Sequence, residues 1–206
     1  MEKINVVFMG TPDFSLNVLK MLIEKTNVIG VVTQPDKIVG KNSEKSFSPV
    51  KKIALGNNIK VIQPEKIRKE YQEVVDLAPD MIVTCAYGQI IPKAILDIPR
   101  YGCINVHASL LPKYRGSAPI QWVLLNGEEK TGISVIYMSK GMDEGDILYQ
   151  KKIEIDDIDT NTTLFNKLSN LALNCLLDFL PDFFVGKFQN IIYLLIVLLL
   201  LNLLVI

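Results

Sequence analysis

The fold is decided by the first part of the chain, the stretch KINVVFMGTPDF at residues 3–14. Residues 3–9 form an apolar run rich in β-branched side chains, which predicts a buried strand that ends at Gly10. Thr11-Pro12-Asp13 then supplies an N-cap candidate, a proline at the first helical position and an early acid, all typical of a helix start. Apolar residues recur at helical spacing over residues 14–23, and a second buried strand is predicted at residues 28–33. The opening is therefore a βαβ unit.

The same alternation of strands and helices continues to about residue 180. We expect further strands at residues 60–62, 81–84, 103–106, 132–138 and 147–155, and helices at residues 48–56, 64–77, 118–125 and 161–180. Residues 34–47 are polar and show no period, so we interpret them as an exposed loop. Buried strands that alternate with helices predict an α/β fold, a doubly wound, mostly parallel sheet with helices on both faces.

Length and composition limit the kind of protein this is. The chain of 206 residues is long enough for one sizeable core and too short for a large multi-domain machine. Its 22 Lys and Arg side chains balance 22 Asp and Glu side chains, so a site for a polyanion requires a local cluster of lysines. Cys85, Cys103 and Cys175 are odd in number and widely spaced, which fits neither a disulfide framework nor a paired metal site. We therefore expect a cytoplasmic protein.

The end of the chain, residues 191–206, does not fit this pattern because it carries no charge and has Asn202 as its one polar break. It is shorter than the ~20 residues that span a bilayer core. Three interpretations stay open: a membrane tail anchor, a buried C-terminal helix, and a terminus that is not native sequence, such as a reading-frame shift. We favour the last, because the Leu/Ile monotony begins just after a well-patterned helix.

Ligand sites in open α/β sheets lie at the carboxyl ends of strands, and three candidate segments follow predicted strands. Gly10-Thr11-Pro12 matches neither glycine-rich phosphate-binding pattern, so no nucleotide cofactor is expected. Asn105 and His107 share one side of their strand because side chains alternate. His107 is the only histidine, and without plausible cysteine partners we expect no metal site.

The third candidate segment is the acidic loop at residues 139–146, which can present a carboxylate to His107. Histidine is a general acid or base near neutral pH, a carboxylate can orient it, and an asparagine amide can donate to an oxyanion. Such a set suits acyl transfer to an amine without a covalent enzyme intermediate. The alternatives are a solvated acidic turn and a structural histidine.

Five segments, in order and spacing, resemble those of the formyltransferases that use 10-formyltetrahydrofolate. They are residues 7–14, residues 33–37 with 48–51, residues 86–92, residues 103–116 and residues 141–146. The resemblance covers about residues 1–187 and is closest to the members whose acceptor is the charged methionyl initiator tRNA. It implies a Rossmann-like formyltransferase catalytic domain over residues 1–187.

The resemblance also implies roles for individual residues. Asn105, His107 and Asp143 occupy the catalytic positions of the family, and Ser109, Leu110, Leu111 and Pro112 its folate-contacting loop. The implied reaction is attack of the methionyl α-amine on the formyl carbon of 10-formyltetrahydrofolate. Asn105 would stabilise the oxyanion, His107 would shuttle protons from the amine to the leaving N10, and Asp143 would orient His107. No metal and no redox step are implied.

Residues 34–52 match an insertion loop of the family that touches the acceptor arm of the tRNA. Five lysines against Asp36 and Glu44 leave this segment a charge of +3, as phosphate contact requires. Lys37, Lys41 and Lys45 are the predicted tRNA contacts, and a solvated loop is the alternative.

Family members usually continue into a smaller β-barrel domain, whereas this chain has the apolar tail at residues 188–206. We therefore expect a truncated chain. We also expect a monomer with no protein partner. Two alternatives to the tRNA reaction stay open. One is formyl chemistry with another acceptor, such as a purine precursor, a sugar amine or water. The other is an inactive or membrane-tethered remnant that binds only the folate.

Overall fold

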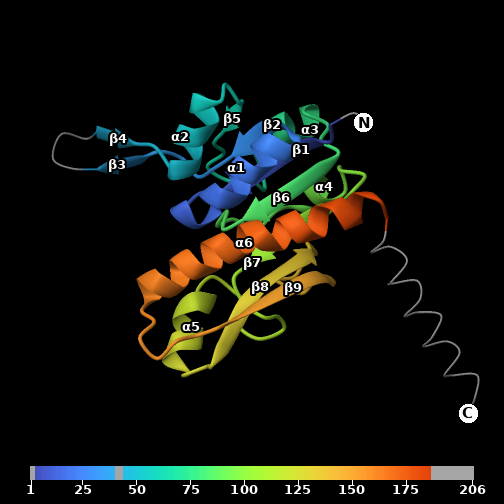
Figure 1. Ribbon diagram of the computed structural model, residues 1–206. Helices are drawn as coiled ribbons and strands as arrows, with labels where there is room; N and C mark the ends of the chain where they lie inside the picture. The colour runs from blue at the N-terminus through green and yellow to red at the C-terminus, as the bar shows by residue number, and fades with distance from the viewer. Residues whose placement is uncertain (1–2, 40–43, 187–206) are drawn as a thin grey trace, which may run out of the picture.

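The computed structural model describes residues 3–39 and 44–186. Lys41 and the apolar tail at residues 191–206 lie outside these ranges. The described chain folds around one seven-stranded sheet with helices on both faces (Figure 1). This arrangement confirms the predicted α/β fold.

The sheet has the strand order β5-β2-β1-β6-β7-β8-β9. The strands are β1 (Asn5–Gly10), β2 (Asn27–Val32), β5 (Val61–Ile62), β6 (Met81–Cys85), β7 (Cys103–His107), β8 (Lys130–Tyr137) and β9 (Ile147–Glu154). The strands from β5 to β7 pair in parallel, whereas β8 runs antiparallel to β7 and β9 antiparallel to β8. The carboxyl ends of β1, β6 and β7 therefore meet at one edge.

Alternate side chains of β1 enter two separate cores, one on each face of the sheet. Val6 and Phe8 pack in a core with residues of α1 (Leu16–Lys25), α2 (Pro49–Gly56), α5 (Pro119–Leu125) and α6 (Asn161–Phe184). Val7 and Met9 pack in a core that includes residues of α3 (Gln72–Asp76) and α4 (Lys93–Leu96). Because both faces bury apolar side chains, β1 is continuously apolar from Val6 to Met9 instead of alternating between apolar and polar residues.

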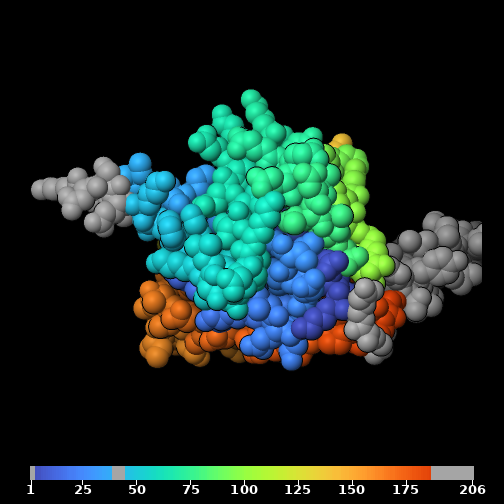
Figure 2. All heavy atoms as spheres, turned by 90° about the horizontal axis from the view of Figure 1, so that it is seen from above, coloured from blue at the N-terminus to red at the C-terminus, as the bar shows by residue number. Residues whose placement is uncertain are grey.

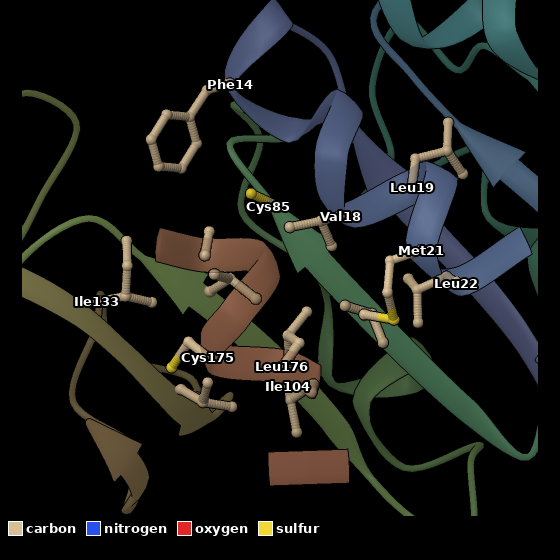
Figure 3. Packing of buried hydrophobic residues seen from close by; sticks show 14 of the residues in the cluster. Phe14, Val18, Leu19, Met21, Leu22, Cys85, Ile104, Ile133, Cys175 and Leu176 are labelled. Carbon is tan, nitrogen blue, oxygen red and sulfur yellow. The ribbon is translucent and has the colours of Figure 1, made fainter. Parts of the chain in front are cut away.

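The longest helix, α6, lies across the first of these faces (Figure 1). Figure 3 shows Leu176 of α6 beside Ile104 of β7, with Val18 and Met21 of α1 close by. These side chains are at most 4% exposed. The helix runs beyond its predicted end at residue 180 and contains Pro181, because the ring of Phe184 in its last turn packs edge-on against Tyr101.

The prediction of a loop at residues 34–47 is wrong for part of that segment. β3 (Lys37–Val39) and β4 (Glu44–Ser46) pair antiparallel as a hairpin that projects from the body of the molecule (Figures 1 and 2). Each strand has only three residues, which is too short for a two-residue period to be visible in the sequence. The helix α2 at its base agrees with prediction, with the Ser48 hydroxyl accepting from the Lys51 amide.

The predicted helix at residues 64–77 is also wrong in its first half, because only α3, residues 72–76, is helical. The amide of Ile67, which a helix would use internally, donates instead to the side-chain oxygen of Gln89 at 2.9 Å. The short helix α4 was not predicted, because a single turn after Pro92 carries no periodic signal. Within the described ranges, no helix is both long and apolar enough to cross a membrane.

Candidate active site

A cavity of about 550 Å³ lies beside the carboxyl half of β7. Its walls are the end of β7 and the following residue, residues 105–108, together with the loops at residues 86–91 and 138–143 and part of residues 116–121. Phe14, Ile91 and Ile120 give it apolar surface, and Asn105, His107 and Asp143 line it as polar groups. A largely apolar cavity with a few convergent polar groups is the usual form of a small-molecule site.

The structure brings the three predicted catalytic side chains together. Asp143 Oδ2 lies 3.5 Å from His107 Nδ1, and Asn105 Nδ2 donates to Asp143 Oδ1 at 3.2 Å. The side chains of His107 and Asp143 are 7% and 12% exposed, so their electrostatic interaction is only weakly screened by water. Their role in catalysis stays a prediction, but their proximity is what that prediction requires.

Asp143 reaches this position by a route that the sequence does not indicate. Because β8 is antiparallel to β7, its end at Tyr137 pairs with Ile104 near the start of β7. The loop after β8 therefore leaves the sheet away from the end of β7 and folds back across its face. There Asp143 adopts a φ of 52°, and its Oδ2 accepts from the amide of Gly116 at 2.9 Å.

The orientation of the Asn105 amide follows from its two neighbours. Thr84 Oγ1 lies 2.8 Å from Asn105 Oδ1 and can donate to it, while the carboxylate of Asp143 requires a donor and so faces Nδ2. The second Nδ2 hydrogen is then available to a ligand in the cavity. The site thus contains a neutral donor of the kind that stabilises an oxyanion.

The two ring nitrogens of His107 are also distinguished by their surroundings. Nε2 lies 2.8 Å from the backbone carbonyl oxygen of Tyr114, which can only accept, so Nε2 carries a hydrogen. Nδ1 faces the carboxylate of Asp143. A protonated ring would then donate from both nitrogens, to a carbonyl and to a carboxylate.

The predicted folate-contacting residues lie in the loop after β7 and are not among the residues that line the cavity. Ser109 is fully buried, and its hydroxyl donates to the carbonyl of Lys113 at 2.7 Å. The amide of Leu111 donates to Ser134 Oγ at 3.0 Å. These contacts hold the loop that carries Tyr114, and a direct folate contact from Ser109, Leu110, Leu111 and Pro112 stays a prediction.

Several groups at the site could not be identified from the sequence. The carbonyl of Tyr114 and the amide of Gly116 are backbone groups, which every residue type carries, so no residue pattern singles them out. In the sequence, Thr84 is one residue of a predicted buried strand, and only the structure shows that it pairs with Asn105 on the next strand. Within the described ranges, no group of three or more His, Cys, Asp and Glu side chains is placed to hold a metal ion.

Two of the predicted tRNA-contacting lysines, Lys37 and Lys45, are exposed on β3 and β4 of the projecting hairpin. Lys51, counted in the same positive segment, instead forms an ion pair with Asp36 at 2.6 Å. Hydrogen bonds from Gln63 and Lys51 hold the pKa of Asp36 below its usual value. The pair neutralises itself, so the positive excess of the segment rests on its other lysines.

A family model described as formyl transferase matches residues 2–180. The methionyl-tRNA formyltransferase of Bacillus cytotoxicus is 52% identical over 191 residues, which are 91% of this chain and 61% of that protein. The methionyl-tRNA formyltransferase of Listeria monocytogenes is 49% identical over 188 residues, 90% of this chain and 60% of that protein. The chain therefore spans about three fifths of the length of these curated relatives.

Solved structures share the fold at much lower identity. A phosphoribosylglycinamide formyltransferase from Bacillus halodurans has a TM-score of 0.71 and 19% identity, covering 82% of this chain and 90% of that one. A sugar N-formyltransferase from a Shewanella species has a TM-score of 0.66 and 21% identity, covering 89% of this chain and 71% of that one. At these identities the likeness concerns the fold alone.

Proposed function

The chain belongs to the formyl transferase family, and from this premise we propose that it transfers the formyl group of 10-formyltetrahydrofolate to the α-amine of methionyl initiator tRNA. The observation that carries the proposal is the meeting of Asn105, His107 and Asp143 at one wall of the 550 Å³ cavity. The relatives named methionyl-tRNA formyltransferase, about half identical over nine tenths of the chain, favour this acceptor over other amines.

The cavity suits a formylated folate. Its volume lies within the ~300–1,000 Å³ typical of sites for drug-sized ligands. Ile91, Val106 and Ile120 supply apolar surface for flat rings, and the polar groups of Asn105 and His107 lie together, where a single reactive carbonyl can meet both. The folate supplies an activated formyl group, and the chain itself supplies positioning, hydrogen bonds and proton transfer.

Each of the three side chains has one task in this reaction. Asn105 donates its second Nδ2 hydrogen to the formyl oxygen as that oxygen gains negative charge. His107 accepts at Nδ1 the proton that the attacking α-amine loses, and returns it to N10 of the folate as the bond from N10 to the formyl carbon breaks. Asp143 stabilises the protonated ring in between, so the charge on His107 never lacks a partner.

The tRNA would contact the hairpin as well as the cavity. Lys37 and Lys45 are exposed on β3 and β4, which project from the body of the molecule (Figure 1). Lysines in this position bind phosphate oxygens without reading bases, and so fix where the acceptor end lies. Lys41 belongs to the same proposal by its place in the sequence.

The test is formyl transfer by the full chain with three acceptors: methionyl initiator tRNA, free methionine and a purine-pathway amine. We expect transfer to the charged tRNA alone, and its loss in His107→Ala. Transfer to the small amine instead would move the assignment to another acceptor. Folded protein that binds the folate but formylates none of the three would contradict the proposal.

A further inference from the structure

The two hydrogen-bond acceptors around His107 favour opposite neutral forms of its ring. The carbonyl of Tyr114, 2.8 Å from Nε2, requires the hydrogen on Nε2. The carboxylate of Asp143, 3.5 Å from Nδ1, favours the hydrogen on Nδ1. The closer contact is the one with Tyr114, so the tautomer of His107 depends on where that carbonyl points.

The direction of that carbonyl depends on a backbone conformation that residues other than glycine rarely adopt. Tyr114 has a φ of 59°, in the left-handed region. A residue of this kind persists in such a conformation only where its surroundings hold it. The hydroxyl of Ser109 contributes a long contact of 3.4 Å to the same carbonyl oxygen, and its shorter bond, 2.7 Å, goes to the carbonyl of Lys113.

The side chain of Tyr114 is held at its far end by the turn after α5. Its hydroxyl donates to Glu128 Oε1 at 2.6 Å and accepts from Asn126 Nδ2 at 3.0 Å. Lys113 Nζ donates to the same Glu128 oxygen at 3.0 Å. These bonds from Tyr114 and Lys113 lower the pKa of Glu128, which keeps it a charged and therefore strong acceptor.

We propose that Glu128 is a positioning residue for His107: by holding the Tyr114 side chain it keeps the Tyr114 carbonyl on Nε2, and so leaves Nδ1 as the proton-accepting nitrogen. Glu128 is not among the residues that line the cavity. Glu128 acts through Tyr114, and Tyr114 lies in the loop that follows His107. The assignment of the tautomer does not depend on the proposed function, whereas its consequence for catalysis does.

Because the chain has a single histidine, the signals of labelled histidine report on His107 alone. Long-range proton–nitrogen NMR spectra of the full chain, labelled with ¹⁵N-histidine and free of substrate, distinguish the nitrogen that carries the hydrogen. We expect Nε2–H in the unchanged protein at a pH where the ring is neutral. In Tyr114→Phe and Glu128→Ala, Asp143 becomes the dominant acceptor, and we expect the Nδ1–H form to rise about tenfold relative to Nε2–H, as for loss of one hydrogen bond of ordinary strength.

Two further variants separate positioning from general stability. Glu128→Gln keeps an oxygen that accepts from the Tyr114 hydroxyl, so it should restore the original tautomer. Glu129→Gln removes the neighbouring carboxylate and should leave the spectrum unchanged. Tyr114→Phe retains the ring that packs on the core, and its fold is checked by circular dichroism and by its melting temperature. An unchanged tautomer in folded Tyr114→Phe would overturn the proposal.

The catalytic consequence is read separately, in formyl transfer. We expect kcat to fall about tenfold in Tyr114→Phe and Glu128→Ala, with little change in the KM for the folate, because the cavity walls are untouched. If the tautomer changes but kcat does not, Glu128 positions the ring of His107, but the tautomer has no importance for the reaction. Absence of activity in every variant and in the unchanged protein would count against the proposed function alone.

Discussion

The replacement Asp143→Asn tests the central contact of the site. Asparagine has the same shape but no charge, and its side chain offers one acceptor and one donor. Asp143 accepts from two donors, Asn105 Nδ2 at 3.2 Å and the Gly116 amide at 2.9 Å, so in the variant one of them faces an NH₂ group. The protonated form of His107 also loses its counter-charge.

The size of the effect follows from the geometry. Two unit charges 3.5 Å apart interact by about 5 kcal/mol at an effective dielectric constant of about 20. The ring charge is spread over two nitrogens and asparagine still accepts one bond, so we expect a loss of about 3 kcal/mol, or roughly 10²-fold in kcat. The loss should appear in kcat rather than in KM, because in the proposed reaction the charge on His107 develops as the proton is transferred.

Single-turnover formyl transfer to charged tRNA at saturating folate measures this loss. Glu144→Gln is the matched control, because Glu144 is the next residue, is 57% exposed and lies 3.8 Å from Arg115. We expect the control to stay within about twofold of the unchanged protein, as for other exposed ion pairs. The reasoning is refuted if folded Asp143→Asn keeps a third or more of the activity, or if Glu144→Gln loses as much.

The remaining predictions concern the hairpin, acid stability and the loop after β8. Lys37→Ala with Lys45→Ala should weaken tRNA use and make the plot of log affinity against log salt shallower by up to about one per lysine; equal slopes would contradict this. Hydrogen bonds from Lys167 and from the backbone lower the pKa of Asp159 to about 2, so its contribution to stability is present above the unfolded value of 3.8 and lost as the pH falls toward 2. The gap in urea midpoint between the unchanged protein and Asp159→Asn should therefore narrow from pH 5 to pH 3, and a constant gap would exclude this linkage. Gly145→Ala would place a methyl group 1.6 Å from a backbone carbonyl oxygen of β8, so we expect a lower melting temperature and loss of activity, and full activity would show that the loop adjusts.

Much of the fold could be predicted because it depends on local properties of the chain. The strand at β1 and the helix α2 follow from β-branched runs and from capping residues such as Ser48, whose effects act within one turn. The segments that were predicted wrongly are those where a distant group intervenes. Gln89 accepts from the amide of Ile67, which a continuous helix would bond internally, and Tyr101 packs against Phe184 beyond the proline of α6.

The sequence by itself determined the alternating fold, the family resemblance and the placement of Asn105 and His107 on one side of a strand, because these depend on residue order and on the two-residue repeat of a strand. Only the tertiary structure decided how the site is completed. The antiparallel direction of β8 requires its loop to fold back and deliver Asp143, and the left-handed conformation of Tyr114 aims a carbonyl at His107. Strand direction and the aim of a backbone group are set by the closure of the whole chain around its core, and no local pattern of side chains carries that information.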